Sequence, residues 1–353
     1  MGWIPEAYSA GLVSVIIPTF NRANLTLETL ESVKAQTYRP LEVIIVDDGS
    51  TDNTCEVVEN WSASQHSDLG LRLLYLPGAN RGAPATRNRG LAASTGEFIQ
   101  YLDSDDTLER YKLELHVKSL RRNPDWEMVY GSSFAMEDGT PADPVNFIGR
   151  EAFLLEAVRS WTIPTHNPLF RRSGCIRLGP WDERMKCFED ATYMGTIFCL
   201  GLSYGYERAA RSHIRGHHRN TESQSVRVSY RGETARYRDH VLSQYYHLDA
   251  MCRRMPDAFR VQPLVRRALA QECFRISRLL FGIGDFEKAR ALLEFHREFA
   301  VDRRSKVEVG SLRWLSFLLG KRVGARSHAA IHDQLHGWLT GARRLVAARG
   351  IHK

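Results

Sequence analysis

The strongest constraint on the fold is an alternation of short β-branched runs with helix-like segments through the first half of the chain. The predicted strands occupy residues 13–18, 41–46, 71–76, 98–102 and 127–131. Helical spacing or helix-starting residues predict helices over 25–36, from about 52 to 61, over 84–93 and from a Thr107 cap to about 122. This alternation predicts an α/β fold with a doubly wound, mostly parallel sheet flanked by helices.

Acidic clusters follow two of these predicted strands directly. Asp47 and Asp48 end the run LEVIIV, and Asp103, Asp105 and Asp106 end the run FIQYL. Because ligands of doubly wound sheets bind outside the carboxyl ends of the strands, we expect both clusters on one rim. Oxygen-rich sites of this kind suit Mg²⁺ or Mn²⁺. The alternative is that the first cluster only forms a turn and the second only caps a helix.

A basic segment, NRGAPATRNRG, begins at Asn80 and contains Arg81, Arg87 and Arg89 beside a predicted helix start. Guanidinium groups and helix N-termini both favour phosphate. The segment therefore predicts a phosphate contact, with a solvated basic helix face as the alternative.

Charge divides the chain into two regions. Residues 1–207 hold 19 Lys and Arg against 28 Asp and Glu, whereas the whole chain carries +7 and residues 208–353 therefore carry +16. Helical spacing recurs at 230–254, 261–281, 285–300 and 327–349. We expect a first domain over 1–220 that carries the metal-binding carboxylates, followed by a basic helical region over 221–353 that contacts an acceptor, a membrane surface or a second copy of the chain.

Composition narrows the class of protein. Hydrophobic residues make up 43% and charged residues 25%, as in a folded globular chain, and no run approaches the length of a membrane span. The first residues lack a signal-peptide pattern and the six cysteines are scattered, so a cytoplasmic location with reduced thiols is expected. The segment SLRWLSFLLGKR at 311–322 favours peripheral contact with an anionic membrane, or else forms an ordinary packed helix.

Five segments occur in an order that resembles the family 2 glycosyltransferases: VSVIIPTFNR, VIIVDDGSTDNT, NRGAPATRNRG, FIQYLDSDD and CFED. The resemblance covers about residues 12–220, and it implies that the domain over 1–220 binds the nucleotide-sugar and catalyses. It implies the GT-A fold, a nucleotide-sugar donor with UDP favoured, a Mg²⁺ or Mn²⁺ cofactor, and transfer to an acceptor hydroxyl with inversion. The implied acceptor is a saccharide or a lipid-linked molecule of polysaccharide, lipopolysaccharide or glycoconjugate synthesis.

The resemblance also implies which residues contact the donor. The matches to the family's nucleotide contacts are Pro18, Thr19, Arg22, Asn80 and Arg87. Asp47 matches the carboxylate that meets the base, typically a uracil imide. Asp103, Ser104 and Asp105 match the DxD motif, whose second Asp holds the metal between the two phosphates.

On the acceptor side, Glu189 and Asp190 match the family's catalytic pair, with Asp190 as the general base. The alternative is that Asp190 only favours the start of a helix over 191–200. His217 matches a downstream Arg-x-His that reaches the metal or the pyrophosphate, although His218 is a second candidate. For His166, a place in a loop is preferred over a place at the acceptor entrance.

Two other functions remain as alternatives. A nucleotidyltransferase would also bind a nucleotide with Asp and Mg²⁺, but the segment PTFNR stands where such enzymes carry a Gly-rich basic loop. A nucleic-acid-binding protein would fit the basic C-terminal region. The acidic first half would repel a polyanion, so we expect no nucleic-acid partner.

Overall fold

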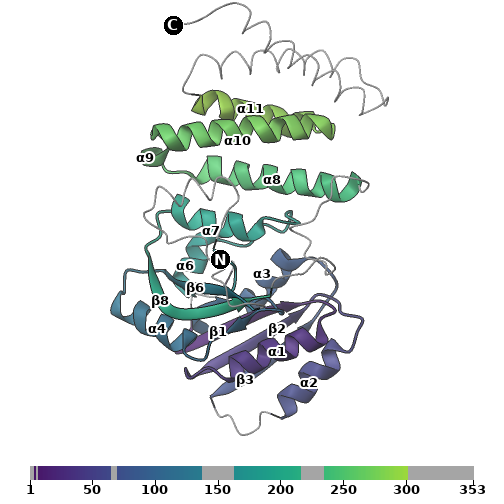
Figure 1. The fold of residues 1–353 in the computed structure, drawn as a ribbon, viewed down its shortest axis with the longest axis vertical. Coiled ribbons are helices and arrows are strands. Elements are labelled where there is room, and N and C mark those ends of the chain that lie inside the picture. Colours follow the sequence, from purple (N-terminus) through teal and green to yellow (C-terminus); the bar gives the residue numbers. More distant parts are fainter. Residues whose placement is uncertain (1–3, 5–6, 65–69, 137–162, 216–233, 301–353) are drawn as a thin grey trace, which may run out of the picture. The chain divides into compact units, whose positions relative to one another are not determined.

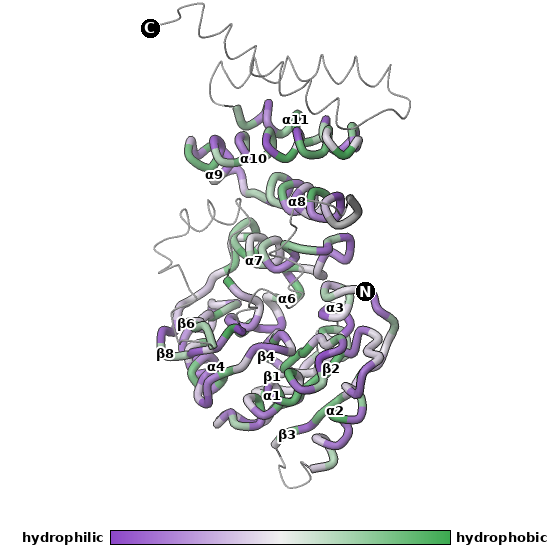
Figure 2. Tube along the Cα trace, turned by 45° about the vertical axis from the view of Figure 1, so that its right-hand side comes forward, coloured by the Kyte–Doolittle hydropathy of each residue, from purple (hydrophilic) through white to green (hydrophobic). Residues whose placement is uncertain are grey.

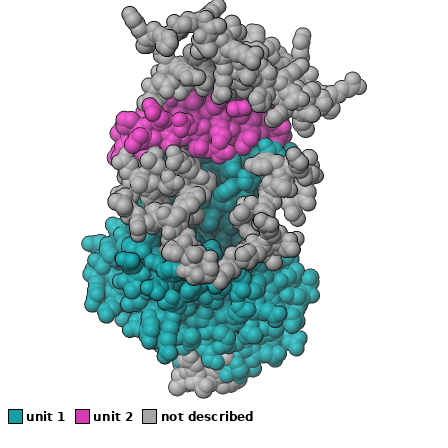
Figure 3. All heavy atoms as spheres, viewed as in Figure 1, with its two compact units in different colours: residues 1–257 teal, residues 258–353 magenta. Residues whose placement is uncertain are grey.

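The computed structural model describes residues 4, 7–64, 70–136, 163–215 and 234–300, and these form two compact units, residues 1–257 and 258–353 (Figures 1 and 3). The domain boundary predicted at 220/221 falls outside the described residues and stays a prediction. Helix α8 (Thr234–Arg254), which follows that boundary, belongs to the first unit.

One eight-stranded sheet organises the first unit, in the order β3-β2-β1-β4-β7-β6-β8-β5 (Figure 1). The strands are β1 (Ser9–Thr19), β2 (Leu41–Asp47), β3 (Leu71–Pro77), β4 (Gly96–Tyr101), β5 (Thr107–Leu108), β6 (Met128–Ala135), β7 (Leu169–Arg171) and β8 (Tyr204–Ile214). Strands β3, β2, β1 and β4 are mutually parallel. Strand β7 is antiparallel to both β4 and β6, and β8 is parallel to β6. The sheet is thus mixed, and its parallel half is the part that the strand–helix alternation predicted.

Helices cover both faces of the parallel half. Its helices are α1 (Ala23–Lys34), α2 (Thr54–Ala63) and α3 (Ala83–Ala93). Val15 and Ile17 of β1 form a buried cluster with residues of α1 and α2, so these two helices lie on one face. On the other face, α3 approaches the sheet at Gly90, where an added Cβ would lie 2.4 Å from Ile16 Cγ2. The doubly wound arrangement is therefore confirmed.

The remaining helices of the first unit are α4 (Lys112–Arg122), α6 (Arg172–Leu178) and α7 (Glu189–Cys199), followed by α8. The prediction that Thr107 caps a helix is wrong. Thr107 and Leu108 instead form β5, which pairs with Ser212 and His213 of β8, and the helix begins five residues later. Pairing with a strand a hundred residues away prevails over the local capping preference.

The second unit contains α10 (Pro263–Gly282) and α11 (Phe286–Phe299), preceded by the short α9 (Asp257–Arg260). Hydrophobic and hydrophilic residues alternate along α10 and α11, as Figure 2 shows. The predicted helix start at Asp285 is confirmed, because its carboxylate accepts the Lys288 N–H at 3.2 Å. The predicted helix at 327–349 and the segment at 311–322 lie outside the described residues. Among the helices that are described, none has the length and apolar character to cross a bilayer.

Candidate active site

The carboxyl ends of β1, β2 and β4 lie at one edge of the sheet. Parallel register places Thr19 beside Asp47, and Ile16 beside Tyr101, just before the DSDD segment. Pro18 and Thr19 therefore lie at the rim, and the Thr19 hydroxyl is 2.8 Å from that of Thr26. The expectation that both acidic clusters follow strands ending at one edge is confirmed.

Asp47 is 4% exposed and is fixed on both sides. Its Oδ1 accepts the Ser50 N–H at 2.7 Å, and its Oδ2 accepts the Tyr75 hydroxyl at 2.5 Å. Burial and the Asp47 carboxylate both raise the pKa of Tyr75, so the phenol remains a donor. Sequence reasoning missed Tyr75, which a strand pattern does not distinguish from a packing residue.

Asp48 ties the basic segment to the end of β2. Its two carboxylate oxygens accept the N–H groups of Arg81 and Gly82 at 2.7 and 2.8 Å. These two hydrogen bonds orient the loop that leads into α3. Sequence reasoning did not predict this role of Asp48. Asn80, a predicted nucleotide contact, is exposed in the same loop.

Arg87 joins the DxD segment to the predicted catalytic pair. Its guanidinium is 2.8 Å from Asp103 Oδ1 and 3.1 Å from Glu189 Oε1, and it lies 4.7 Å from the centre of the Trp181 ring. The side chain is 5% exposed, so both ion pairs are largely shielded from water. Burial alone would raise the pKa of Asp103, but Arg87 outweighs it and holds that pKa below its usual value.

Asp105 faces the loop after β1. Arg22 Nη1 lies 2.7 Å from Asp105 Oδ2, and the Asp105 side chain is 7% exposed. Ser104 between the two aspartates is buried. Arg22, predicted to contact the nucleotide, thus contacts the predicted metal ligand.

Carboxylate oxygens at Asp103 and Asp105 are the hard donors that Mg²⁺ and Mn²⁺ prefer, so the residues fit such an ion. Among the described residues, no three Asp, Glu, His or Cys side chains form a ready metal cluster. An ion held here would therefore take further oxygens from phosphates and water. His217, the other predicted metal contact, lies outside the described residues.

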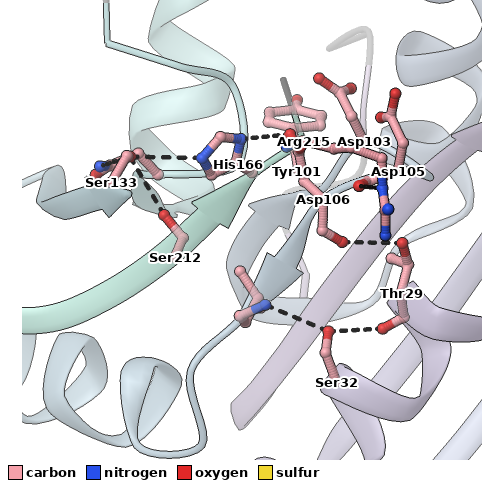
Figure 4. Close-up of polar contacts among 12 residues, drawn as sticks. Thr29, Ser32, Tyr101, Asp103, Asp105, Asp106, Ser133, His166, Ser212 and Arg215 are labelled. Atoms are coloured by element: carbon pink, nitrogen blue, oxygen red, sulfur yellow. Dashed lines mark hydrogen bonds and ion pairs between the residues drawn. The ribbon is translucent and has the colours of Figure 1, made fainter. Parts of the chain in front are cut away.

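Asp106, behind the DxD segment, connects three parts of the chain (Figure 4). Its Oδ2 is 2.7 Å from His166 Nδ1, its Oδ1 accepts the Arg215 N–H at 3.0 Å, and its carbonyl accepts the Thr29 hydroxyl at 2.9 Å. His166 lies in a turn and is 1% exposed. Burial would lower the pKa of His166, but Asp106 outweighs it and raises that pKa. This agrees with the preferred prediction, a place in a loop, whereas the alternative place at an acceptor entrance does not fit so buried a ring.

Asp190 lies in the first turn of α7, and its Oδ1 accepts the Ala191 N–H at 2.7 Å. This contact is compatible with the helix-start reading as well as with a general base. Burial first, and then the adjacent Glu189 charge, raise the pKa of Asp190 from 3.8 to about 6. Such a pKa suits proton transfer near neutral pH, which a helix-start carboxylate does not need.

Two solved structures share this fold. The mannosyltransferase PcManGT from Pyrobaculum calidifontis, in complex with GDP-Man and Mn²⁺, matches with a TM-score of 0.51 at 23% identity, over 86% of this chain and 80% of that one. TarS from S. aureus, in complex with UDP-GlcNAc, matches with a TM-score of 0.52 at 19% identity, over 81% and 89%. The class of protein is therefore an α/β protein with a GT-A type fold.

Sequence comparisons match part of the chain to one family. Residues 14–177 match the family described as glycosyl transferase family 2. An uncharacterized glycosyltransferase of Rickettsia bellii is 40% identical over 111 residues, 31% of this chain and 15% of that relative. GlyG, a glycosyltransferase of Streptococcus pneumoniae, is 32% identical over 127 residues, 36% of this chain and 40% of that relative. The match to the family model therefore covers residues 14–177, somewhat less than half of this chain, and the chain spans less than half of these two relatives.

Proposed function

We propose that this protein is an inverting glycosyltransferase that moves a sugar from a nucleoside diphosphate to an acceptor hydroxyl. The observation that carries the proposal is the continuous chain of contacts from Asp103 through Arg87 to Glu189, next to Asp190. This chain of contacts supports the proposal because Asp103, in the segment that would hold the metal, is joined through Arg87 to Glu189, the neighbour of the proposed base. One buried arginine thus links donor and acceptor sides of the site.

Each residue has a role that follows from its chemistry. Asp47, held by Tyr75 and Ser50, would accept hydrogen bonds from the base. Arg22 and Arg87 would turn guanidinium donors toward the diphosphate. A Mg²⁺ or Mn²⁺ ion at Asp105 would neutralise charge that develops on the leaving diphosphate.

Asp190 would take the proton of the acceptor hydroxyl as that oxygen attacks the anomeric carbon. With a pKa of about 6, the carboxylate is mostly ionised at neutral pH, yet it is more basic than an ordinary aspartate. A single displacement from the face opposite the leaving group inverts the anomeric centre.

The donor and the surroundings are also part of the proposal. One solved structure of this fold binds UDP-GlcNAc and another GDP-Man with Mn²⁺, which supports a nucleotide-sugar donor and a divalent ion. We propose a UDP-sugar, a saccharide or lipid-linked acceptor, and a cytoplasmic site of action at the periphery of an anionic membrane. The basic C-terminal region would then contact the membrane, the acceptor or a second copy of the chain.

The test is a panel of UDP-, dTDP- and GDP-sugars, measured for thermal stabilisation and for hydrolysis with and without Mn²⁺. We expect one nucleotide class to stabilise the protein and to be hydrolysed only with the metal. Release of pyrophosphate from a nucleoside triphosphate and a sugar phosphate would instead indicate a nucleotidyltransferase. Salt-dependent binding of nucleic acid, tighter than that of any nucleotide-sugar, would contradict both.

A further inference from the structure

The loop that carries the predicted catalytic pair is held by α8, a helix outside the stretch that matches the family. Ser243 of α8 is 1% exposed, and its Oγ accepts the N–H groups of Lys186 and Cys187 at 3.0 and 3.4 Å. These two residues come directly before Phe188, Glu189 and Asp190. Two backbone donors of this loop are therefore satisfied by a single side chain from α8.

Two histidines of α8 extend the contact along the same stretch. His240 Nδ1 lies 3.8 Å from Cys187 Sγ, and its ring meets the Phe188 ring edge-on at 5.1 Å. One helical turn beyond Ser243, His247 Nδ1 is 2.9 Å from the Thr192 hydroxyl, in the first turns of α7. His240, Ser243 and His247 are spaced by three and four residues and so lie on one face of α8. This face contacts the chain on both sides of Asp190.

The segment that α8 contacts, residues 186–192, contains a strained residue. Phe188 has a φ of 61°, a left-handed conformation that a bulky side chain rarely adopts. Such a conformation persists only where the surroundings impose it. The Phe188 carbonyl accepts both the N–H and the hydroxyl of Thr192. The N–H contact is the first hydrogen bond of α7, which begins directly after Phe188. Contacts from α8 on residues 186–188 and on Thr192 thus fix the backbone that aims Asp190.

We propose that α8 is a positioning element of the active site, and that Ser243 is its central positioning residue. It acts on Asp190 through the backbone of residues 186–188 and does not itself contact a substrate. The inference rests on the proposed function, because it assigns α8 to the geometry of the general base. It adds a part of the site that the matched family stretch, residues 14–177, does not contain.

The test compares Ser243→Ala with Met251→Ala in the full chain. Met251 is buried on the same helix, but its sulfur contacts Cys199 at the far end of α7. Donor and acceptor KM, kcat, the Kd of the active donor's nucleoside diphosphate, and Tm are measured for each variant. We expect Ser243→Ala to lower kcat about 10-fold or more with donor KM and nucleotide Kd within twofold, because a small misplacement of a reacting group is costly. We expect Met251→Ala to lower Tm at least as much, with kcat within twofold.

A fall of kcat that follows Tm equally in both variants would overturn the inference, as would an unchanged kcat in Ser243→Ala. Should Ser243→Ala fail to fold, His240→Ala removes contacts from the same loop, and the same comparison with Met251→Ala decides. A wild-type chain that transfers no sugar would remove the proposed function and this inference with it. An active wild type with an insensitive Ser243 and His240 would remove the inference alone.

Discussion

Replacing Asp190 by Asn should greatly lower the rate of sugar transfer and stabilise the fold at the same time. The pKa of Asp190 lies near 6 in the folded protein and 3.8 is its ordinary value, so the folded state holds this proton more tightly than the unfolded chain. Above pH 7 the carboxylate is ionised in both the folded and the unfolded protein, and the folded state is destabilised by the full free energy of holding this charge in a buried site. At 1.36 kcal/mol for each pKa unit, a shift of about 2 units costs ~3 kcal/mol.

An asparagine has almost the same shape and carries no charge at any pH. Its side-chain oxygen can still accept the Ala191 N–H, so the variant keeps that contact. We therefore expect Asp190→Asn to raise the free energy of unfolding at pH 7.5 by ~1–3 kcal/mol. Sugar transfer should fall by about 10²–10⁴ when a general base is lost.

The sign of the pH dependence distinguishes this cause from improved packing. As pH falls from 7 through 6 toward 3.8, folded wild type takes up the proton and loses its penalty, so the advantage of Asp190→Asn should shrink to about 1 kcal/mol at pH 4.5. Urea titrations at both pH values measure it. Asp182 is a matched control, because its hydrogen bonds with Arg184 outweigh burial and lower its pKa. Asp182→Asn should destabilise the protein at pH 7.5.

The argument that burial and Glu189 raise the pKa of Asp190 would be refuted by either of two results. One is an Asp190→Asn variant less stable than wild type at pH 7.5, and the other is a gain in stability that is the same at pH 4.5 as at pH 7.5. Wild-type transfer rates in a folded variant would refute its role as the base.

Three further predictions concern Glu189, the ion pair of Arg22 with Asp105, and the packing of α3 on the sheet. Glu189→Gln removes the neighbouring charge, so the acid limb of the kcat profile should move to a midpoint below 6; an unchanged midpoint would contradict this. Arg22→Ala removes the cation that competes with a metal ion for the Asp105 carboxylate, so isothermal titration should show tighter binding of Mn²⁺ alone and weaker binding of UDP. Weaker Mn²⁺ binding would contradict this competition. Gly90→Ala places a Cβ 2.4 Å from Ile16 Cγ2 and should destabilise the protein by about 1–3 kcal/mol in urea, and a neutral effect would show that α3 moves freely.

Much of the donor side could be predicted because it is encoded locally. An apolar β-branched run that stops at acidic residues, as at Asp47 and Asp103, identifies both the strand and the edge where it ends. Parallel strands end at a common edge, so the acidic clusters had to meet there. Strand β1 and helices α1 and α3 follow the same local patterns, within a few residues of their predicted bounds.

Contacts between distant segments could not be predicted from these patterns. The pairing of Thr107 with His213 turns an expected helix cap into a strand, and no local preference at Thr107 reveals a partner so far along the chain. The ion pair of Arg22 with Asp105 and the contacts of Ser243 are of the same kind. A serine within a helix usually faces solvent or packs against neighbours, so the sequence does not mark Ser243. Its two backbone partners are seen only in the structure, where α8 lies beside the start of α7.

The direction of the sheet changes at β7, which pairs antiparallel with β4 on one side and β6 on the other through five residue pairs. Strands β2 and β4, which lead into the two acidic clusters, lie on one side of this narrow seam, and β6 and β8 lie on the other. Insertions or exchanges beyond the seam need not disturb the register of the first four strands. Chimaeras joined at β7 should therefore keep the edge formed by β1, β2 and β4 while they replace β6 and β8.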